Sequence, residues 1–283
     1  MMLKLSKIWY YISLLFYLGT FLYLVSYKAE PISSIILPYI LYFVITKLIF
    51  LGNTIGYLGL VIQLITKKTY ISKKLFKIAL KLKATNVNIL SVYSLILLRD
   101  GKTQQAKNIY ENLLARKDIK LQMRKILEAN LAICFWKLGE LDKAINQYES
   151  VTNDKFNQQY ITANDYTTLG YLHIEKNNLD KALRYTEWAL KLDEKHSSAL
   201  DNLGQIYYKQ EDYERAISYF KKAIELKKYS VDSNYYLGLI YEEQENYKNA
   251  KSYYENALKG NMSALNSVSE EMIKSKLDKI PVT

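Results

Sequence analysis

A pattern that recurs every 34 residues constrains this chain more than any other feature. Shifting the sequence by 34 positions superimposes a Leu-Gly pair, a histidine or tyrosine three residues after the glycine, and two later alanines. Small residues at fixed places in helical segments let two helices cross closely, and the apolar residues between them fill the remaining space. With only three prolines in 283 residues, the pattern predicts an all-α chain of stacked helix pairs. The superimposed positions are Leu169, Leu203 and Leu237; Gly170, Gly204 and Gly238; Ala182, Ala216 and Ala250; and Ala189, Ala223 and Ala257.

These residues and their spacing resemble the tetratricopeptide repeat. Residues 197–230 and 231–264 match the repeat at nearly every defining position, whereas residues 163–196 carry His173 and Thr186 where aromatic residues are expected. Two earlier units follow a period of about 38 residues and cover residues 125–162 and 87–124. The resemblance extends over about residues 69–264 and implies an α-solenoid that binds peptides or protein surfaces on its concave side.

The two ends of the repeat region carry their own predictions. Residues 67–85 form a basic helix that resembles the second half of a repeat, with Phe76 and Ala79 in register. We therefore assign residues 86–264 to the repeats and residues 265–283 to a capping helix and tail, since stacked arrays need a polar cap. The apolar residues expected on the cap are Leu265, Val268, Met272 and Leu277.

The N-terminal 66 residues are predicted to be a membrane anchor. Residues 8–27 are free of formal charge and residues 32–51 contain only Lys47, so each is about the length needed to cross a bilayer as a helix. A short turn joins them into a transmembrane hairpin. The next apolar stretch, residues 53–65, is too short to cross, so it extends the second span, lies in the interface or packs under the repeats. A cleaved signal peptide is the alternative for the first span.

Charge predicts the orientation of this hairpin. Residues 67–85 hold seven lysines and no acid, whereas residues 86–283 hold 28 basic and 27 acidic residues. The positive-inside rule then places both ends of the hairpin, and the repeats, in the cytoplasm. A third crossing by residues 53–65 would put the repeats outside. We expect the basic segment to contact anionic lipid headgroups through Lys67, Lys68, Lys73, Lys74, Lys77 and Lys81.

No catalytic arrangement is found in the sequence. Cys134 is the single cysteine, and the two histidines, His173 and His196, have no partner at metal-ligand spacing. Phosphate-binding loops and nucleophile motifs are absent. We predict no enzyme activity, no cofactor, no metal and no small-molecule substrate. The near balance of charge in residues 86–283 also argues against a nucleic-acid partner.

If the first helix of each repeat lines the concave side, a polar groove follows. The residues flanking the Leu-Gly core on that side include Asp201 and Asp232 together with amides and tyrosines. The lysines and arginine that hold a terminal carboxylate in chaperone-binding members of the family are missing, which favours an internal peptide segment or a helix as ligand. The predicted groove residues are Asn130, Asn164, Thr167, Tyr171, Asn202, Gln205 and Tyr235.

These features predict a membrane-anchored, non-catalytic scaffold or adaptor that binds a protein or peptide in the groove. Two alternatives use the same parts. The first is a non-catalytic subunit or assembly factor of a membrane complex, in which the hairpin makes the essential contact. The second is an outward-facing factor in envelope assembly or secretion.

Overall fold

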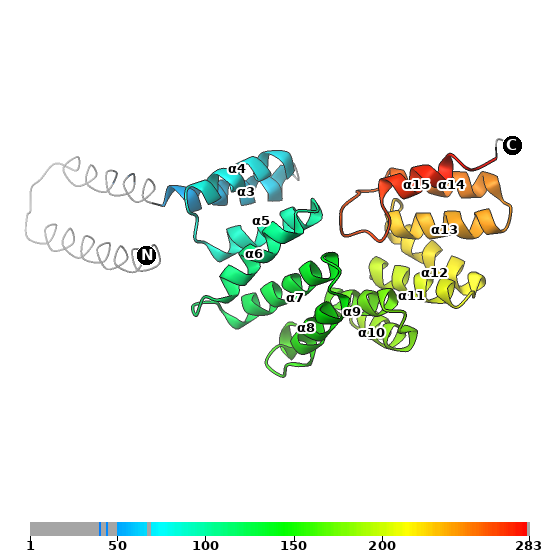
Figure 1. The fold of residues 1–283 in the computed structure, drawn as a ribbon, viewed down its shortest axis with the longest axis horizontal. Helices are drawn as coiled ribbons and strands as arrows, with labels where there is room; N and C mark the ends of the chain where they lie inside the picture. The colour runs from blue at the N-terminus through cyan, green and yellow to red at the C-terminus, as the bar shows by residue number, and fades with distance from the viewer. Residues whose placement is uncertain (1–39, 41–43, 45–49, 67–68, 282–283) are drawn as a thin grey trace, which may run out of the picture. The chain divides into compact units, whose positions relative to one another are not determined.

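The computed structural model describes residues 50–66 and 69–281, together with residues 40 and 44, and its regular elements in these ranges are all helices (Figure 1). The chain divides into two compact units, with the boundary between Tyr93 and Ser94. The predicted spans, residues 8–27 and 32–51, lie almost entirely outside the described residues. Among the helices that are described, none is both long and apolar enough to cross a bilayer.

The first unit contains helices α3 (Leu51–Thr66) and α4 (Thr69–Lys81) and the beginning of α5 (Val87–Arg99). Helix α3 turns its glycines toward its neighbours. A Cβ on Gly52 would lie 2.6 Å from the Leu82 carbonyl oxygen, and one on Gly56 would lie 2.6 Å from the Ile89 side chain. The absence of side chains on this face lets the helix backbones approach closely. The apolar stretch at residues 53–65 is therefore a helix packed against α4 and α5.

Helices α3 and α4 repeat a contact that is made within the tetratricopeptide pairs. A Cβ on Gly59 would lie 3.1 Å from the Phe76 ring, and one on Gly204 would lie 2.5 Å from the Phe220 ring. In both pairs a glycine of the first helix faces a buried ring of the second. The basic helix, predicted as a half-repeat, is thus paired with α3, and the predicted boundary at residue 66 lies between the two helices of that pair.

The second unit begins within α5 and consists of helices joined by short turns. Helices α7 and α8, α9 and α10, α11 and α12, and α13 and α14 are the principal contacting pairs. A short 3-10 turn, η1 (Gln158–Tyr160), follows α8 and accounts for part of the longer spacing there. The helices are α6 (Thr103–Leu114), α7 (Leu121–Lys137), α8 (Leu141–Asn153), α9 (Ala163–Glu175), α10 (Leu179–Leu192), α11 (Ser197–Lys209), α12 (Tyr213–Leu226), α13 (Val231–Glu243) and α14 (Tyr247–Leu258).

Small residues and rings interlock within the α11–α12 and α13–α14 pairs as the repeat pattern predicts. Ala216, Ala223, Ala250 and Ala257 are all completely buried, as are the rings of Phe220 and Tyr254. A Cβ on Gly238 would overlap the Tyr254 ring. The glycine therefore provides the space that the ring fills. In the pair formed by α9 and α10, Thr186 replaces the ring and donates a 2.7 Å hydrogen bond to the Ala182 carbonyl.

The turn between the two helices of a pair also repeats. In each of these turns one residue has a positive φ. From the α5–α6 turn to the α13–α14 turn, these residues are Gly101, Gly139, Asn177, Glu211 and Glu245. This conformation ends the first helix and reverses the chain within a few residues. Only glycine and asparagine adopt it without strain, so the glutamates at residues 211 and 245 carry a small conformational cost.

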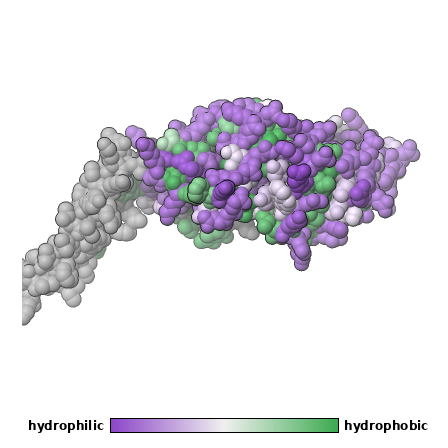
Figure 2. Space-filling view, turned by 90° about the horizontal axis from the view of Figure 1, so that it is seen from below, coloured by the Kyte–Doolittle hydropathy of each residue, from purple (hydrophilic) through white to green (hydrophobic). Residues whose placement is uncertain are grey.

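The C-terminal end differs from the predicted cap. Helix α15 covers only Glu270–Leu277, because the Ser269 side chain accepts a hydrogen bond from the Met272 amide and starts the helix there. Residues 259–269, which we call the strap, form a non-helical connection from α14 to α15. Ile273 rather than Met272 supplies the buried side chain of α15. The face of the described residues that Figure 2 shows is mostly hydrophilic, with separate hydrophobic patches.

Candidate peptide-binding pocket

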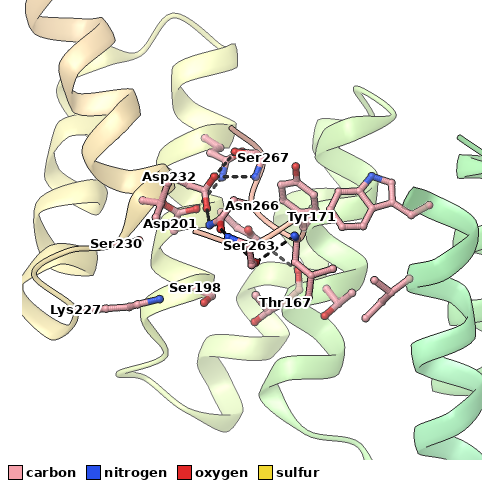
Figure 3. Close-up of a pocket in the computed structure, with 17 residues that line it drawn as sticks. Thr167, Tyr171, Ser198, Asp201, Lys227, Ser230, Asp232, Ser263, Asn266 and Ser267 are labelled. Carbon is pink, nitrogen blue, oxygen red and sulfur yellow. Dashed lines mark hydrogen bonds between the residues drawn. The ribbon is translucent and has the colours of Figure 1, made fainter. Parts of the chain in front are cut away.

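A pocket of about 260 Å³ lies among the first helices of successive pairs. We call it the inner pocket. Helices α7, α9, α11 and α13 each contribute lining residues, and the strap contributes Ser263, Leu265, Asn266 and Ser267 (Figure 3). These four helices are also the ones on which the sequence placed the predicted groove residues.

Two carboxylates make one wall of the inner pocket acidic. Asp201 of α11 is buried and accepts hydrogen bonds from the Ser233 hydroxyl and, at 2.7 Å, from the Gln205 amide. Its burial, and then the negative charge of nearby Asp232, raises the pKa of Asp201 to about 7. Asp232 lies in the first turn of α13 and is half-buried. This side of the pocket therefore presents carboxyl groups beside the amides.

Four predicted groove residues line the pocket, namely Thr167, Tyr171, Asn202 and Gln205. The two amides are buried and already serve as internal connections. Asn202 donates a 2.8 Å hydrogen bond to the Thr167 carbonyl of the preceding pair, and Gln205 binds Asp201. The nitrogens of both amides are therefore engaged in contacts within the array.

The wall opposite the carboxylates is aromatic. The rings of Trp136 and Tyr171 meet edge to face with centroids 5.2 Å apart. The Tyr171 hydroxyl donates a 2.6 Å hydrogen bond to Glu175, and burial raises its pKa. The Lys137 ammonium lies 3.6 Å from the centre of the Trp136 ring, and burial lowers its pKa. This wall offers apolar area with polar groups at its edge.

The other three predicted groove residues are placed elsewhere. Tyr235 is 7% exposed and packs on Tyr254 in the core formed by α13 and α14, with ring centroids 5.8 Å apart. Asn164 is exposed and its side-chain oxygen lies 3.0 Å from His196 Nε2. Asn130 is half-buried and is not among the residues that line the pocket. The three residues lie on α7, α9 and α13, which are helices that line the pocket, but their own side chains are not among the lining residues.

The predicted lipid-contacting lysines lie on α4 where the structure describes them. Lys74, Lys77 and Lys81 are exposed around Ile78 in a shallow depression. Lys73 is half-buried, and Lys67 and Lys68 lie outside the described residues. The exposed face of α4 also carries Tyr70, Ile71 and Leu82.

Neither histidine nor the cysteine forms a reactive cluster. His173 is buried against Glu149, with Nε2 and Oε1 3.2 Å apart, and burial lowers its pKa. Burial raises the pKa of the Cys134 thiol to about 12, which keeps it protonated at neutral pH. Among the described residues no group of histidine, cysteine and carboxylate side chains is arranged to hold a metal ion.

Paired helices with interlocking glycines and rings, stacked so that their first helices share a pocket, define an α-solenoid protein. A family model described as tetratricopeptide repeat matches residues 94–157, 167–231 and 204–264, together more than half of the chain. The chain belongs to the tetratricopeptide repeat family. Proteins of this family generally act as scaffolds for protein–protein interactions, and most such folds are non-catalytic.

Comparison with solved structures supports the fold. The chain is similar to a protein in the crystal structure of the APC/C hetero-tetramer Cut9-Hcn1, with a TM-score of 0.61, 17% sequence identity, and coverage of 81% of this chain and 42% of that one. It is also similar to a tetratricopeptide repeat protein from Parabacteroides merdae, with a TM-score of 0.50, 16% identity, and coverage of 80% and 97%. A search of curated protein sequences gave no significant match.

Proposed function

We propose that this chain is a non-catalytic adaptor that binds a protein partner in the inner pocket. The observation that supports this function best is the pocket itself. Successive pairs contribute an aromatic wall at Trp136 and Tyr171 and an acidic wall at Asp201 and Asp232. Apolar area beside fixed hydrogen-bonding groups is what a protein needs to bind a peptide with defined orientation.

The acidic wall defines the chemistry of the partner segment. Carboxylate oxygens accept hydrogen bonds, and such bonds from backbone amides, hydroxyls or cations are stronger than those between neutral groups. We infer that the partner presents a stretch of internal peptide with hydrogen-bond donors toward Asp232 and an apolar side chain toward Trp136. Asp232 would repel a free terminal carboxylate, and the Lys227 ammonium is the cation that lines the same pocket.

Photo-crosslinking tests this proposal. A photoreactive phenylalanine analogue at Ser198, which lines the pocket, should capture the partner in the cells that make this protein. The same analogue at Glu187, exposed on α10, is the control. Capture should be strong at residue 198, weak at residue 187, and reduced at residue 198 by Trp136→Ala. Equal capture at both positions would show that the pocket is not the binding site.

We further propose that the exposed face of α4 lies against an anionic membrane surface. Within the described residues of the first unit there is no aspartate or glutamate. Lys74, Lys77 and Lys81 alternate with Tyr70 and Ile78, which are 67% and 44% exposed. Lysines of this kind contribute about 1 kcal/mol each near an anionic surface, and the apolar residues between them can enter the interface.

An environment-sensitive fluorophore on Ile78→Cys tests the membrane contact, with Glu187→Cys as the control. Because Cys134 is fully buried and protonated, it need not be removed. In full-length protein mixed with vesicles, emission at residue 78 should increase with phosphatidylglycerol and decrease as salt rises from about 50 to 200 mM. The same response with neutral vesicles would contradict an electrostatic contact.

The cytoplasmic location of the repeats is also a proposal, which rests on the lysine distribution. Cysteines at Ser33 and Glu187 should respond oppositely to a membrane-impermeant thiol reagent added to intact cells, with labelling only at residue 33. Labelling only at residue 187 would favour the outward-facing alternative. The alternative of a membrane-complex subunit predicts that exchanging residues 1–50 for an unrelated hairpin abolishes partner capture at Ser198.

A further inference from the structure

The strap forms part of the wall of the inner pocket. It connects α14 to α15, and Figure 3 shows Asn266 and Ser267 between Asp232 and Tyr171. Ser263, Leu265, Asn266 and Ser267 all line the pocket, so a segment of the chain itself takes up space at the site where we place the partner. The question is whether the strap is a permanent wall or a ligand that can leave.

Asp232 receives three hydrogen bonds from the strap. The Asn266 side-chain amide donates to Oδ2 at 2.9 Å, and the Ser267 backbone amide and hydroxyl donate to Oδ1 at 2.9 and 2.5 Å. One carboxylate in the first turn of α13 therefore binds a backbone N–H and two side chains of a non-helical segment. A bound peptide would use the same groups.

Two further contacts on the other side of the pocket are made through the strap backbone. The Lys137 ammonium donates to the Asn266 carbonyl at 3.3 Å, and the Ala264 amide donates to the Arg99 carbonyl at 2.9 Å. Arg99 ends α5 and Lys137 ends α7. The strap thus connects residues more than 100 positions away in sequence, with backbone groups that any peptide also carries.

The strap is fastened by apolar side chains only at its ends. Met262 and Val268 pack into the core of α13 and α14, and Val268 is 5% exposed. Between them, Leu265 is no more than partly buried, so residues 263–267 are held mainly by polar contacts. Polar contacts can be exchanged for equivalent contacts at small net cost. The fastened ends would keep a displaced segment nearby, at an effective concentration in the millimolar range.

We propose that residues 263–267 are an internal ligand of the inner pocket and that they must leave before a partner segment can bind. The proposal rests on the proposed function of the pocket and states how access of the partner to the pocket is regulated. The partner segment that replaces the strap carries a donor pair equivalent to Asn266 and Ser267, such as adjacent small polar residues in an extended peptide. Without the partner the strap engages the Asp232 carboxylate, so that a partner segment cannot bind it.

The first experiment needs no partner. A fluorescent peptide with the sequence of residues 260–269 is titrated into the wild-type chain and into a full-length variant in which residues 263–267 are replaced by Gly-Ser-Gly-Ser-Gly. The peptide should bind the variant at least tenfold more tightly than wild type. Adding Asp232→Asn to the variant should remove this gain, whereas Asp180→Asn, a first-turn carboxylate of α10, should not. Equal binding to wild type and variant would overturn the proposal.

The second experiment locks the strap in place. A Cβ on Gly101 would lie 3.7 Å from the Ala264 Cβ, within the range for a disulfide. The Gly101→Cys, Ala264→Cys chain should, when oxidised, lose at least tenfold in photo-crosslinking at Ser198, and reduction should restore it. Gly101→Cys alone is the control, since residue 101 has a positive φ and the cysteine itself is strained there.

The two experiments separate the strap from the function. If the locked and unlocked chains capture a partner equally at Ser198, the strap does not control the pocket and the regulatory proposal is wrong, while the adaptor function stands. If the strap peptide binds as expected but no partner is captured at Ser198 in the unlocked chain, the internal ligand stands and the adaptor function is wrong.

Discussion

Replacing Gly204 by alanine tests the packing that defines the helix pairs. The new Cβ would lie 2.5 Å from two carbons of the Phe220 ring. That ring is completely buried and stacks on Tyr236 with centroids 5.5 Å apart, so it has no free space to move into. Overpacking of this kind costs about 1–3 kcal/mol.

The expected change also contains a favourable part. Alanine in a helix interior is more stable than glycine by about 1 kcal/mol. The free energy of unfolding around α11 and α12 should therefore fall by up to about 2 kcal/mol. An alanine at an unobstructed helical glycine would raise it by about 1 kcal/mol, so even the sign of the effect distinguishes the two situations.

A double-mutant cycle isolates the contact. In a Phe220→Leu background the ring is gone and the alanine methyl group has space, so Gly204→Ala should be neutral or stabilising by up to about 1 kcal/mol. The coupling energy between the two positions should then be about 1–3 kcal/mol. Gly139→Ala is the control, because residue 139 has a positive φ and a Cβ added there would meet no atom within 4 Å, so its cost should not depend on Phe220.

Native-state hydrogen exchange of the α11 and α12 amides is the appropriate assay, since a repeat array opens locally and does not unfold in a single step. It should be read in the full-length chain at one pH and temperature. Faster exchange in Gly204→Ala that disappears in the Phe220→Leu background would support the packing described here. A coupling energy near zero would refute it.

Three further changes have defined outcomes. Lys125→Met removes the ammonium that lies 2.5 Å from the buried Asp165 carboxylate. Urea unfolding should show that the free energy of unfolding falls by about 3 kcal/mol and is partly recovered by adding Asp165→Asn. An unchanged free energy of unfolding would contradict a compensated buried pair. Because the pKa of Asp201 is raised to about 7 in the folded chain and is about 4 in unfolded chains, its stabilising effect is complete below about pH 4 and is lost as pH rises through 7. Asp201→Asn should therefore gain stability relative to wild type between about pH 5 and pH 8, measured by thermal unfolding, and a gain toward acid pH would reverse the assignment. Glu211→Gly should stabilise the turn by about 0.5–1 kcal/mol because residue 211 has a φ of 62°, whereas a destabilised variant would mean that the glutamate side chain makes a compensating contact.

Local sequence was sufficient to predict the helix pairs. The fixed spacing from Gly204 to Ala216 and Phe220 specifies a contact between neighbouring helices, and contacts of that kind depend on a few residues within one repeat. The same signal could have revealed the pair formed by α3 and α4. The tetrapeptide YLGL occurs at residues 57–60 and again at 236–239, but the apolar character of the first copy favoured a membrane interpretation.

The inner pocket was only partly predictable. Its helices follow from the repeat, so four of the predicted groove residues line the pocket. Tyr235 packs in the core instead, because the two sides of a tyrosine-rich helix have similar sequences. The strap could not be inferred. Its contact between Ala264 and Arg99 joins residues 165 positions apart, and no periodic pattern encodes such a contact. Its apolar residues, Leu265 and Val268, have a spacing that also fits a short helix.

The strap also changes the mechanics of the array. A stack of helix pairs in which each pair touches only its neighbours behaves as a spring, and its ends can move apart by small rotations summed over every repeat. Because the strap joins Arg99 at the end of α5 to Asp232 at the start of α13 through Ala264 and Ser267, extension of this spring must first break those hydrogen bonds. Under a weak pulling force the array should therefore extend little. It should extend readily only above the force that breaks the hydrogen bonds of the strap.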